Sequence, residues 1–219
     1  MRVGLAVIAA CLIVGGAQAQ TAQNGGPSGE HPLLRQVVSQ VSADQLHATI
    51  AKLVSFGTRH TASDTRSNTR GIGAARRWVQ SQFQSFSQAC GGCLRIETPS
   101  QTFTGERLPQ PTEVMDVLAI LPGTSDPDRV IVISGHLDSR VTDVMNTHSD
   151  APGANDDGSG AAAVIEAARV LSQHRFAATL VFASLSGEEQ GLYGGKVLAD
   201  YARAPNWQVE ADLNNDIVG

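Results

Sequence analysis

The segment VIVISGHLDS, residues 130–139, decides the fold of this chain of 219 residues. Its first part, Val130 to Ser134, is a continuous apolar run rich in β-branched side chains, which is typical of a strand buried on both faces. His136 and Asp138 follow with one residue between them, so both side chains point to the same face if the strand direction continues. The segment therefore predicts a buried central strand that ends on a histidine and a carboxylate.

Strands and helices alternate on both sides of this segment. Helical periodicity predicts helices over residues 31–56, 69–86, 161–173 and 192–202. Apolar runs predict further strands over residues 114–121, 179–185 and 209–218. Within the first predicted helix, Ser42-Ala43-Asp44-Gln45 fits a capping box. The alternation predicts an α/β fold with helices on both faces of the sheet.

Polar and acidic residues follow the predicted strands at the points where these strands end. SGHLDS follows Ile133, SLSGEEQG follows Ala183, and NNDIVG follows Leu213. In open α/β sheets, ligands bind beyond the carboxyl ends of the strands. The residues placed at these ends are His136, Asp138, Glu188, Glu189 and Asp216. We therefore expect the functional site at this edge of the sheet.

The stretch ANDDGSG, residues 154–160, places two carboxylates side by side before a predicted helix. Adjacent like charges disfavour each other's ionised form unless a cation, hydrogen bonds or water offsets the repulsion. A helix cap explains one aspartate, so we expect Asp156 to turn towards a divalent ion while Asp157 serves the helix. Metal-assisted hydrolysis divides the pair Glu188-Glu189 similarly, because one carboxylate binds the ion and the other takes a proton from water.

The four motifs His-x-Asp, Asn-Asp-Asp-Gly-Ser-Gly, Gly-Glu-Glu-Gln-Gly and Asn-Asn-Asp, in this order, resemble the M28 family of zinc metallopeptidases of the secreted bacterial aminopeptidase type. The resemblance is strongest over about residues 114–219. It implies the zinc exopeptidase fold, a phosphorylase/hydrolase-like α/β architecture with a mixed, mostly parallel central sheet. It also implies an enzyme that holds two Zn²⁺ ions per complete domain and releases N-terminal amino acids from peptide substrates with a free N-terminus.

This resemblance implies a role for each motif residue. The implied zinc ligands are His136 and Asp216 for one ion, Glu189 for the other ion, and Asp156 as a bridge between them. Glu188 is similar to the family's general base, and Asp138 would orient the imidazole of His136. Two neighbouring ions would polarise the scissile carbonyl, anchor the free amino group of the substrate and stabilise the oxyanion.

The family pattern contains a further histidine after the strand that carries the last aspartate, and this chain departs from that pattern. The chain ends at Gly219, so we expect the peptidase domain, residues 31–219, to be incomplete at its C-terminus. His148 lies in a polar loop and His174 at the end of a predicted helix. We expect both histidines to be solvated rather than to replace the missing ligand.

Residues 1–19 have the pattern of a signal peptide, with a basic start, a short apolar run and Ala17-Gln18-Ala19 at the end. Because the apolar run is too short to span a membrane, we expect cleavage after Ala19 and export to the periplasm or the exterior. Lipoprotein processing at Cys11 is the alternative. Residues 20–30 are polar and rich in glycine, which predicts a disordered leader.

The segment CGGC, residues 90–93, contains the two cysteines that would remain after cleavage. The same spacing occurs in redox motifs and in zinc knuckles, but the sequence contains no second CxxC. In an exported protein we expect Cys90 and Cys93 to form a local disulfide.

The composition excludes one class of partner. The formal net charge is -5, and nucleic-acid binding needs clustered Lys and Arg, which this chain lacks. Among enzymes, a carboxypeptidase or a single-zinc aminoacyl cyclase shares much of the ligand set. A non-catalytic metal-binding module, or an inactive fragment, would keep the fold and one ion. The motifs favour an exported zinc aminopeptidase over these alternatives.

Overall fold

The computed structural model describes residues 32–204 and 207–219. The predicted signal peptide, its cleavage site after Ala19 and the predicted leader over residues 20–30 lie outside the described residues. Among the helices of the described part, none is long and apolar enough to cross a membrane.

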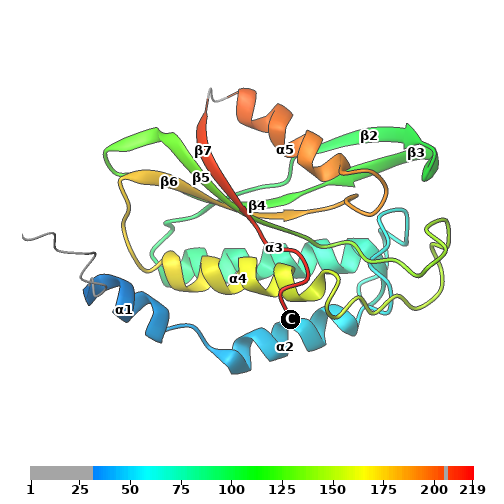
Figure 1. The fold of residues 1–219 in the computed structure, drawn as a ribbon, viewed down its shortest axis with the longest axis horizontal. Coiled ribbons are helices and arrows are strands. Elements are labelled where there is room, and N and C mark those ends of the chain that lie inside the picture. Colours follow the sequence, from blue (N-terminus) through cyan, green and yellow to red (C-terminus); the bar gives the residue numbers. More distant parts are fainter. Residues whose placement is uncertain (1–31, 205–206) are drawn as a thin grey trace, which may run out of the picture.

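A five-stranded sheet forms the centre of the fold (Figure 1). Its strands, in spatial order, are β1 (Arg95–Glu97), β4 (Val117–Leu121), β6 (Ala178–Leu185), β5 (Asp126–His136) and β7 (Gln208–Asn214). Strand β5 is parallel to both of its neighbours, whereas β4 is antiparallel to β1 and β6. Four of these five strands therefore share one direction, which confirms the mixed, mostly parallel sheet.

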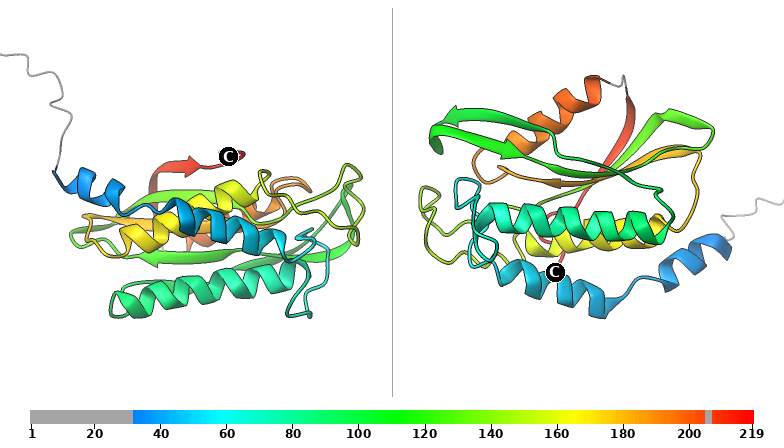
Figure 2. Two further views of the ribbon diagram at one scale, coloured as in Figure 1. Left: turned by 90° about the horizontal axis from the view of Figure 1, so that it is seen from below. Right: turned by 180° about the vertical axis from the view of Figure 1, so that it is seen from behind.

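Helices cover both faces of this sheet, as predicted (Figures 1 and 2). One face carries α2 (Ala43–Val54), α3 (Gly71–Ala89) and α4 (Gly158–Leu171), and the other carries α5 (Tyr193–Arg203). Along β4, Val117 and Ala119 join the core under α2, α3 and α4, while Leu118 packs in the core with Leu198 of α5. A fully buried Val or Leu contributes about 1.5–3 kcal/mol relative to an exposed one, so both cores fix the sheet beneath the site.

Strand β5 is the element predicted from VIVIS. Val130 and Val132 belong to the core that contains Leu198, and Ile131 and Ile133 pack against the core on the opposite face. This arrangement confirms a strand buried on both faces. The strand ends at His136, which brings that imidazole to the edge of the sheet.

The single strand predicted over residues 114–121 was wrong. Strand β3 (Leu108–Met115) pairs with β2 (Ser100–Gly105) in a separate two-stranded sheet, and β4 begins only at Val117. Asp116 lies between them and is fully buried. Its carboxylate accepts a hydrogen bond from the backbone N–H of Ser186 at 3.0 Å. The apolar pattern does not reveal this break, because the partner of Asp116 lies far along the chain.

The single helix predicted over residues 31–56 was also wrong, because the structure has α1 (Pro32–Ser39) followed by α2. The Ser42 hydroxyl accepts a hydrogen bond from the backbone N–H three residues later, which confirms the cap at the start of α2. The second bond of a capping box is replaced, because Ser42 N–H donates to Glu166 Oε1 of α4 at 2.7 Å. Arg169 of α4 donates a hydrogen bond to the carbonyl of Gln40 at 2.5 Å. This contact holds the chain between the two helices in a non-helical path.

A disulfide joins Cys90 and Cys93 directly after α3, as predicted. Both cysteines are half-buried, and Cys93 Sγ contacts the carbonyl oxygen of Ser172 at the end of α4. The bond closes a very short loop, so its contribution to stability is small.

Candidate metal centre

The carboxyl ends of β5, β6 and β7 meet at one edge of the sheet, because β5 is parallel to both neighbours. His136 is the last residue of β5, Glu188 follows the end of β6, and Asp216 follows the end of β7. Asp156 lies in the turn that leads into α4. Residues from four separate segments therefore converge at the edge where the sequence predicts the site.

His136 lies at the centre of this group, and its side chain is only 4% exposed. Its Nε2 atom lies 3.2 Å from Asp156 Oδ1, 3.8 Å from Asp216 Oδ1 and 3.9 Å from Glu188 Oε2. We call these four residues the carboxylate cluster. The three acidic side chains are 48%, 44% and 33% exposed, so the cluster is open to solvent on one side.

These distances fit a zinc ion. Zinc binds imidazole nitrogen and carboxylate oxygen at about 2.1 Å, so two ligand atoms at the tetrahedral angle lie about 3.4 Å apart. The distance between His136 Nε2 and Asp156 Oδ1 is 3.2 Å, close to that value. Ligand atoms of His136, Asp157 and Asp216 also all lie within 4.8 Å of one another. One nitrogen and several oxygens suit zinc, and they also suit cobalt or manganese.

Asp138 is fully buried and connects His136 to residues 186–189, which we call the glutamate loop. The backbone carbonyl oxygen of Asp138 lies 3.0 Å from His136 Nδ1, and its Oδ1 atom lies 3.5 Å from the same nitrogen. Its two carboxylate oxygens accept hydrogen bonds from the backbone N–H groups of Glu188 and Glu189, each at 3.2 Å. Burial alone would raise the pKa of Asp138, but His136 and these N–H donors hold it below its ordinary value. Because Asp138 engages Nδ1, the Nε2 atom faces the other carboxylates, as in a metal-binding histidine.

The charges of the cluster shift the pKa values of its members. Burial lowers the pKa of His136, but the hydrogen bond and charge of Asp138, with the charge of Asp157, raise it to about 10. Burial raises the pKa of Glu188, although the charge of His136 opposes this shift. The field at His136 therefore favours a positive charge, which either a proton or a divalent cation supplies.

The pair Asp156-Asp157 divides its two carboxylates between the cluster and α4. Asp157 is fully buried, and its oxygens accept hydrogen bonds from the N–H groups of Gly160 at 2.8 Å and His136 at 2.9 Å. Burial raises the pKa of Asp157 to about 6, against the opposing effects of His136 and the N–H donors. A β-carbon at Gly160 would lie 2.2 Å from the carbonyl oxygen of Asn215, so glycine allows α4 to approach the chain after β7.

The pair Glu188-Glu189 is divided in another way. Glu188 belongs to the carboxylate cluster, whereas Glu189 is buried and its Oε2 accepts a hydrogen bond from Arg140 Nε at 2.5 Å. Of the four predicted zinc ligands, the structure brings three together and places the fourth against an arginine: His136, Asp156 and Asp216 converge, and Glu189 pairs with Arg140.

His148 and His174 lie away from the cluster. His148 is exposed in the loop after β5, and His174 Nε2 lies 3.3 Å from Gln40 Oε1 beside the end of α4. Among the described residues, the group whose ligand atoms lie within 4.8 Å includes His136 and neither of these two histidines.

Sequence reasoning missed the positions of three side chains: Asp157 at ligand distance, Arg140 and Arg59. The adjacency of Asp157 to Asp156 was the only signal for the first, and Arg140 directly follows SGHLDS. Arg59 is wholly buried, and burial lowers its pKa to about 10 against the charges of Asp138, Asp157 and Asp156. No local pattern marks Arg59, since most of its hydrogen-bond partners lie far along the chain.

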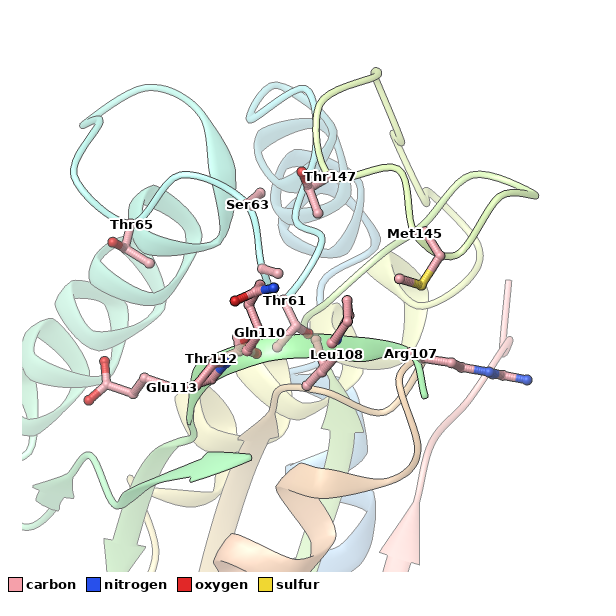
Figure 3. A pocket seen from close by; sticks show the side chains of 13 residues that line it. Thr61, Ser63, Thr65, Arg107, Leu108, Gln110, Thr112, Glu113, Met145 and Thr147 are labelled. Atoms are coloured by element: carbon pink, nitrogen blue, oxygen red, sulfur yellow. Dashed lines mark hydrogen bonds between the residues drawn. The ribbon is translucent and has the colours of Figure 1, made fainter. Parts of the chain in front are cut away.

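Of two cavities in this region, one is lined by Ser186 and Glu188 of the glutamate loop, and the other is joined to the same loop through a hydrogen bond. One cavity of about 330 Å³ is lined by His136, Glu188 and Asp216 and is the open cleft of the carboxylate cluster. A larger cavity of about 510 Å³ lies between β3, the loop that contains Thr61 and the loop that contains Met145 (Figure 3). The Thr61 hydroxyl accepts a hydrogen bond from Gly187 N–H at 2.9 Å, so the wall of the larger cavity is joined to the glutamate loop.

The mixed α/β sheet, with the carboxylate cluster at its carboxyl edge, and the solved structures that align with it define the class of protein: the chain has the zinc exopeptidase fold. An aminopeptidase from Aneurinibacillus sp. strain AM-1 aligns with a TM-score of 0.65 at 14% identity, over 84% of this chain and 72% of that chain. The glutaminyl cyclase of Porphyromonas gingivalis aligns with a TM-score of 0.62 at 20% identity, over 82% of this chain and 62% of that chain. At these identities the likeness shows the fold alone.

Residues 116–219 match the model of peptidase family M28. A probable zinc metalloprotease of the fungus Pyrenophora teres f. teres is 49% identical over 187 residues, which make up 85% of this chain and 39% of that relative. Residues 116–219 of the chain therefore belong to peptidase family M28. The chain spans about 39% of the length of this curated relative.

Proposed function

We propose that the protein is an exported zinc-dependent aminopeptidase that releases N-terminal amino acids through attack by an activated water. One observation carries this proposal. His136 Nε2 has carboxylate oxygens of three residues within 3.2 to 3.9 Å, at the edge of the sheet where this class of fold binds ligands. Similarity to a probable zinc metalloprotease and to an aminopeptidase supports the proposal.

The residues that would hold zinc are His136, Asp156 and Asp216, with Asp157 also at ligand distance and Glu189 for a second ion. When bound, zinc would polarise the scissile carbonyl and lower the pKa of the attacking water. Asp138 keeps the imidazole of His136 oriented with Nε2 towards the other ligands. The carboxylate of Asp138 accepts hydrogen bonds from the backbone N–H groups of Glu188 and Glu189, so one buried residue aligns ligand and base.

Glu188 is the general base in this proposal. Its carboxylate lies beside the ligand nitrogen of His136, and its own backbone N–H is held by Asp138. Burial raises the pKa of Glu188, which makes the carboxylate a stronger base for a proton of water. Glu188 would then return this proton to the leaving amino group of the substrate.

The cleft above the cluster favours a substrate with a positive terminus. Asp212, which neither holds zinc nor acts as the base in this proposal, lines this cleft of about 330 Å³. Carboxylates in a partly enclosed site attract a protonated amino group more strongly than they would in open water. This charge complementarity supports peptides with a free N-terminus over the C-terminal carboxylate that a carboxypeptidase would bind.

Hydrolysis of leucine p-nitroanilide by the purified protein tests the proposal. We expect turnover that a chelator abolishes and that added zinc restores. An N-acetylated peptide should resist cleavage, because its amino group is blocked. Release of the C-terminal residue from that peptide would show a carboxypeptidase instead, and zinc binding without any turnover would favour the non-catalytic module.

A single-zinc aminoacyl cyclase is the second candidate, and one contact favours it. Arg140 engages the carboxylate of Glu189, which is the predicted ligand of the second ion. The likeness to a glutaminyl cyclase supports the same alternative. Incubation with a peptide that begins with glutamine separates the two candidates, because a cyclase forms pyroglutamate and ammonia whereas an aminopeptidase releases glutamine.

Export through a signal peptide is part of the proposal. The pattern over residues 1–19 supports it, and the disulfide between Cys90 and Cys93 is typical of an oxidising compartment. N-terminal sequencing of the secreted protein should begin at Gln20. A secreted product that begins at Cys11 would support lipoprotein processing, and a product that retains Met1 would contradict both.

A further inference from the structure

The segment from Gly57 to Thr61, between α2 and α3, contacts three of the four segments that carry the site. The carbonyl of Gly57 accepts a hydrogen bond from Ala151 N–H at 2.8 Å, in the loop that leads to the aspartate pair. The hydroxyl of Thr61 accepts a hydrogen bond from Gly187 N–H at 2.9 Å, in the glutamate loop. The centre of this segment is Arg59, which contacts the third of these loops.

The guanidinium of Arg59 joins two of the ligand loops directly. Its Nε donates a hydrogen bond to the carbonyl of Leu137 at 2.7 Å, between His136 and Asp138 in the sequence. Its Nη1 donates to the carbonyl of Pro152 at 2.7 Å, and its Nη2 donates to the carbonyl of Gly153 at 2.8 Å. A further bond from Nη1 reaches the carbonyl of Leu53 near the end of α2, at 3.1 Å.

These bonds are directed by the shape of the guanidinium. Its N–H groups form a planar, rigid fork, so acceptors on different segments are held at fixed relative positions. The ammonium of a lysine is a single point charge and cannot span the same set of carbonyls. The carbonyl of Leu137 lies in irregular backbone directly after β5, where no strand or helix partner is provided for it, so Arg59 also satisfies a buried acceptor.

Burial of the Arg59 guanidinium costs free energy, and packing alone does not require a charged side chain at this position. A charged side chain that is 0% exposed loses its hydration, and a buried apolar side chain of similar size would avoid that loss. The charges of Asp138, Asp157 and Asp156 offset part of the cost. The guanidinium is thus placed where its hydrogen bonds and its charge both act on the metal ligands' loops.

We propose that Arg59 is a positioning residue of the metal centre, which sets the distance between the loop of His136 and the turn of Asp156. The proposal rests on the proposed function, because it assumes that these residues bind zinc. The separation at stake is the 3.2 Å between His136 Nε2 and Asp156 Oδ1. Zinc affinity depends on this separation because the ion accepts ligand atoms only within a few tenths of an ångström of their ideal positions.

The test measures zinc affinity directly, by competition with a chromophoric chelator, on the purified protein and on Arg59→Lys. Arg169→Lys is the matched control, because Arg169 also donates to a backbone carbonyl, that of Gln40, but does so at the distant end of α4. Thermal denaturation of each variant shows that the affinity is measured on folded protein. We expect Arg59→Lys to bind zinc at least about tenfold more weakly, and Arg169→Lys to keep the original affinity while losing thermal stability.

A second variant covers the case in which Arg59→Lys does not fold. The hydroxyl of Ser139 accepts a hydrogen bond from Arg59 N–H at 3.1 Å and donates one to the carbonyl of Ala151 at 2.7 Å. Ser139→Ala removes this smaller link between the same loops, and we expect it to weaken zinc binding by about threefold. Unchanged affinity in the folded Arg59 variant, or in Ser139→Ala if that variant alone folds, overturns the proposal. An equal loss in the Arg169 control does so too. If the unmodified protein binds no zinc, the proposed function fails as well.

Discussion

The two pairs of adjacent carboxylates, Asp156-Asp157 and Glu188-Glu189, have the same arrangement but differ in the groups that hold their buried member in place. In each pair, one member lies beside His136 Nε2 and the other is buried. Asp157 is held by backbone N–H groups of α4 and β5. Glu189 is held by the side chain of Arg140, which is itself 36% exposed.

This difference separates a fixed carboxylate from one that can be released. Backbone donors cannot move away without unfolding α4, so Asp157 stays in place. Arg140 is itself half-exposed and can rotate into solvent, which would leave the buried carboxylate of Glu189 free to bind another cation in its place. Under the proposed function, the first ion site would be formed in advance, and a second site at Glu189 would form only when Arg140 leaves.

The largest effect is expected from Glu188→Gln. The change removes the proton acceptor beside His136 but keeps the size of the side chain and its backbone contacts. We expect turnover of leucine p-nitroanilide to fall by about a hundred- to ten-thousandfold, with zinc affinity nearly unchanged. Activity within a factor of two of the original would exclude Glu188 as the base.

Next in size is the loss of stability in Asp157→Ala. The buried carboxylate caps α4 and binds His136 N–H, so its removal should lower the free energy of unfolding by about 2–4 kcal/mol. Urea denaturation in the presence of a chelator measures this value without a contribution from metal. Asp156→Ala is the control: its exposed side chain should change stability by less than about 0.5 kcal/mol. Similar losses in both variants would contradict the division of the pair.

The buried carboxylate of Asp157 also predicts that the free energy of unfolding depends on pH. The pKa of Asp157 is about 6 in the folded protein and 3.8 in its ordinary range. Between these values the folded chain holds more protons than the unfolded chain, so the free energy of unfolding falls as pH rises from about 4 to about 6. Asp157→Asn keeps an acceptor without the titration, and in chelator it should lose this slope. Parallel curves for the two proteins would show that Asp157 does not cause it.

The smallest effect is expected from Arg140→Gln. Freeing the carboxylate of Glu189 should strengthen binding of a second zinc ion by at least about two- to fivefold, because the ion pair with the half-exposed Arg140 no longer competes with the metal. Arg107→Gln is the matched control, because Arg107 Nη1 donates to the backbone carbonyl of Glu189 and leaves its carboxylate paired. Calorimetric titration with zinc measures both variants. A single ion per chain in Arg140→Gln would instead favour the cyclase alternative.

Periodicity and turn chemistry predicted the architecture because the main elements have strong local signals. The buried run at Val130, the helix cap at Ser42 and the strand-end motifs were all recognised within short windows. The breaks at Gln40 and Asp116 were missed, because each is stabilised by a residue on a distant element, Arg169 and Ser186 respectively. Local sequence cannot show a partner that only the folded chain brings near.

The same limit applies to the candidate site. Parallel neighbouring strands end at the same edge, so the convergence of His136 and Asp216 could be predicted from their places after strands. The pairing of Glu189 with Arg140 could not, because it depends on the direction of two side chains on different loops. The hydrogen bonds that Arg59 donates to the ligand loops could not be predicted either, because their acceptors are backbone carbonyl groups, which every residue possesses.

The requirement for glycine at position 160 has a consequence for directed evolution of this protein. A β-carbon there would lie 2.2 Å from the Asn215 carbonyl and 2.5 Å from the carboxylate of Asp157. Any replacement would push α4 away from the strand end and alter the spacing of the ligands. In a library selected for a different metal or substrate, position 160 should therefore remain glycine, whereas position 140 should accept many residues and supply most of the useful variation.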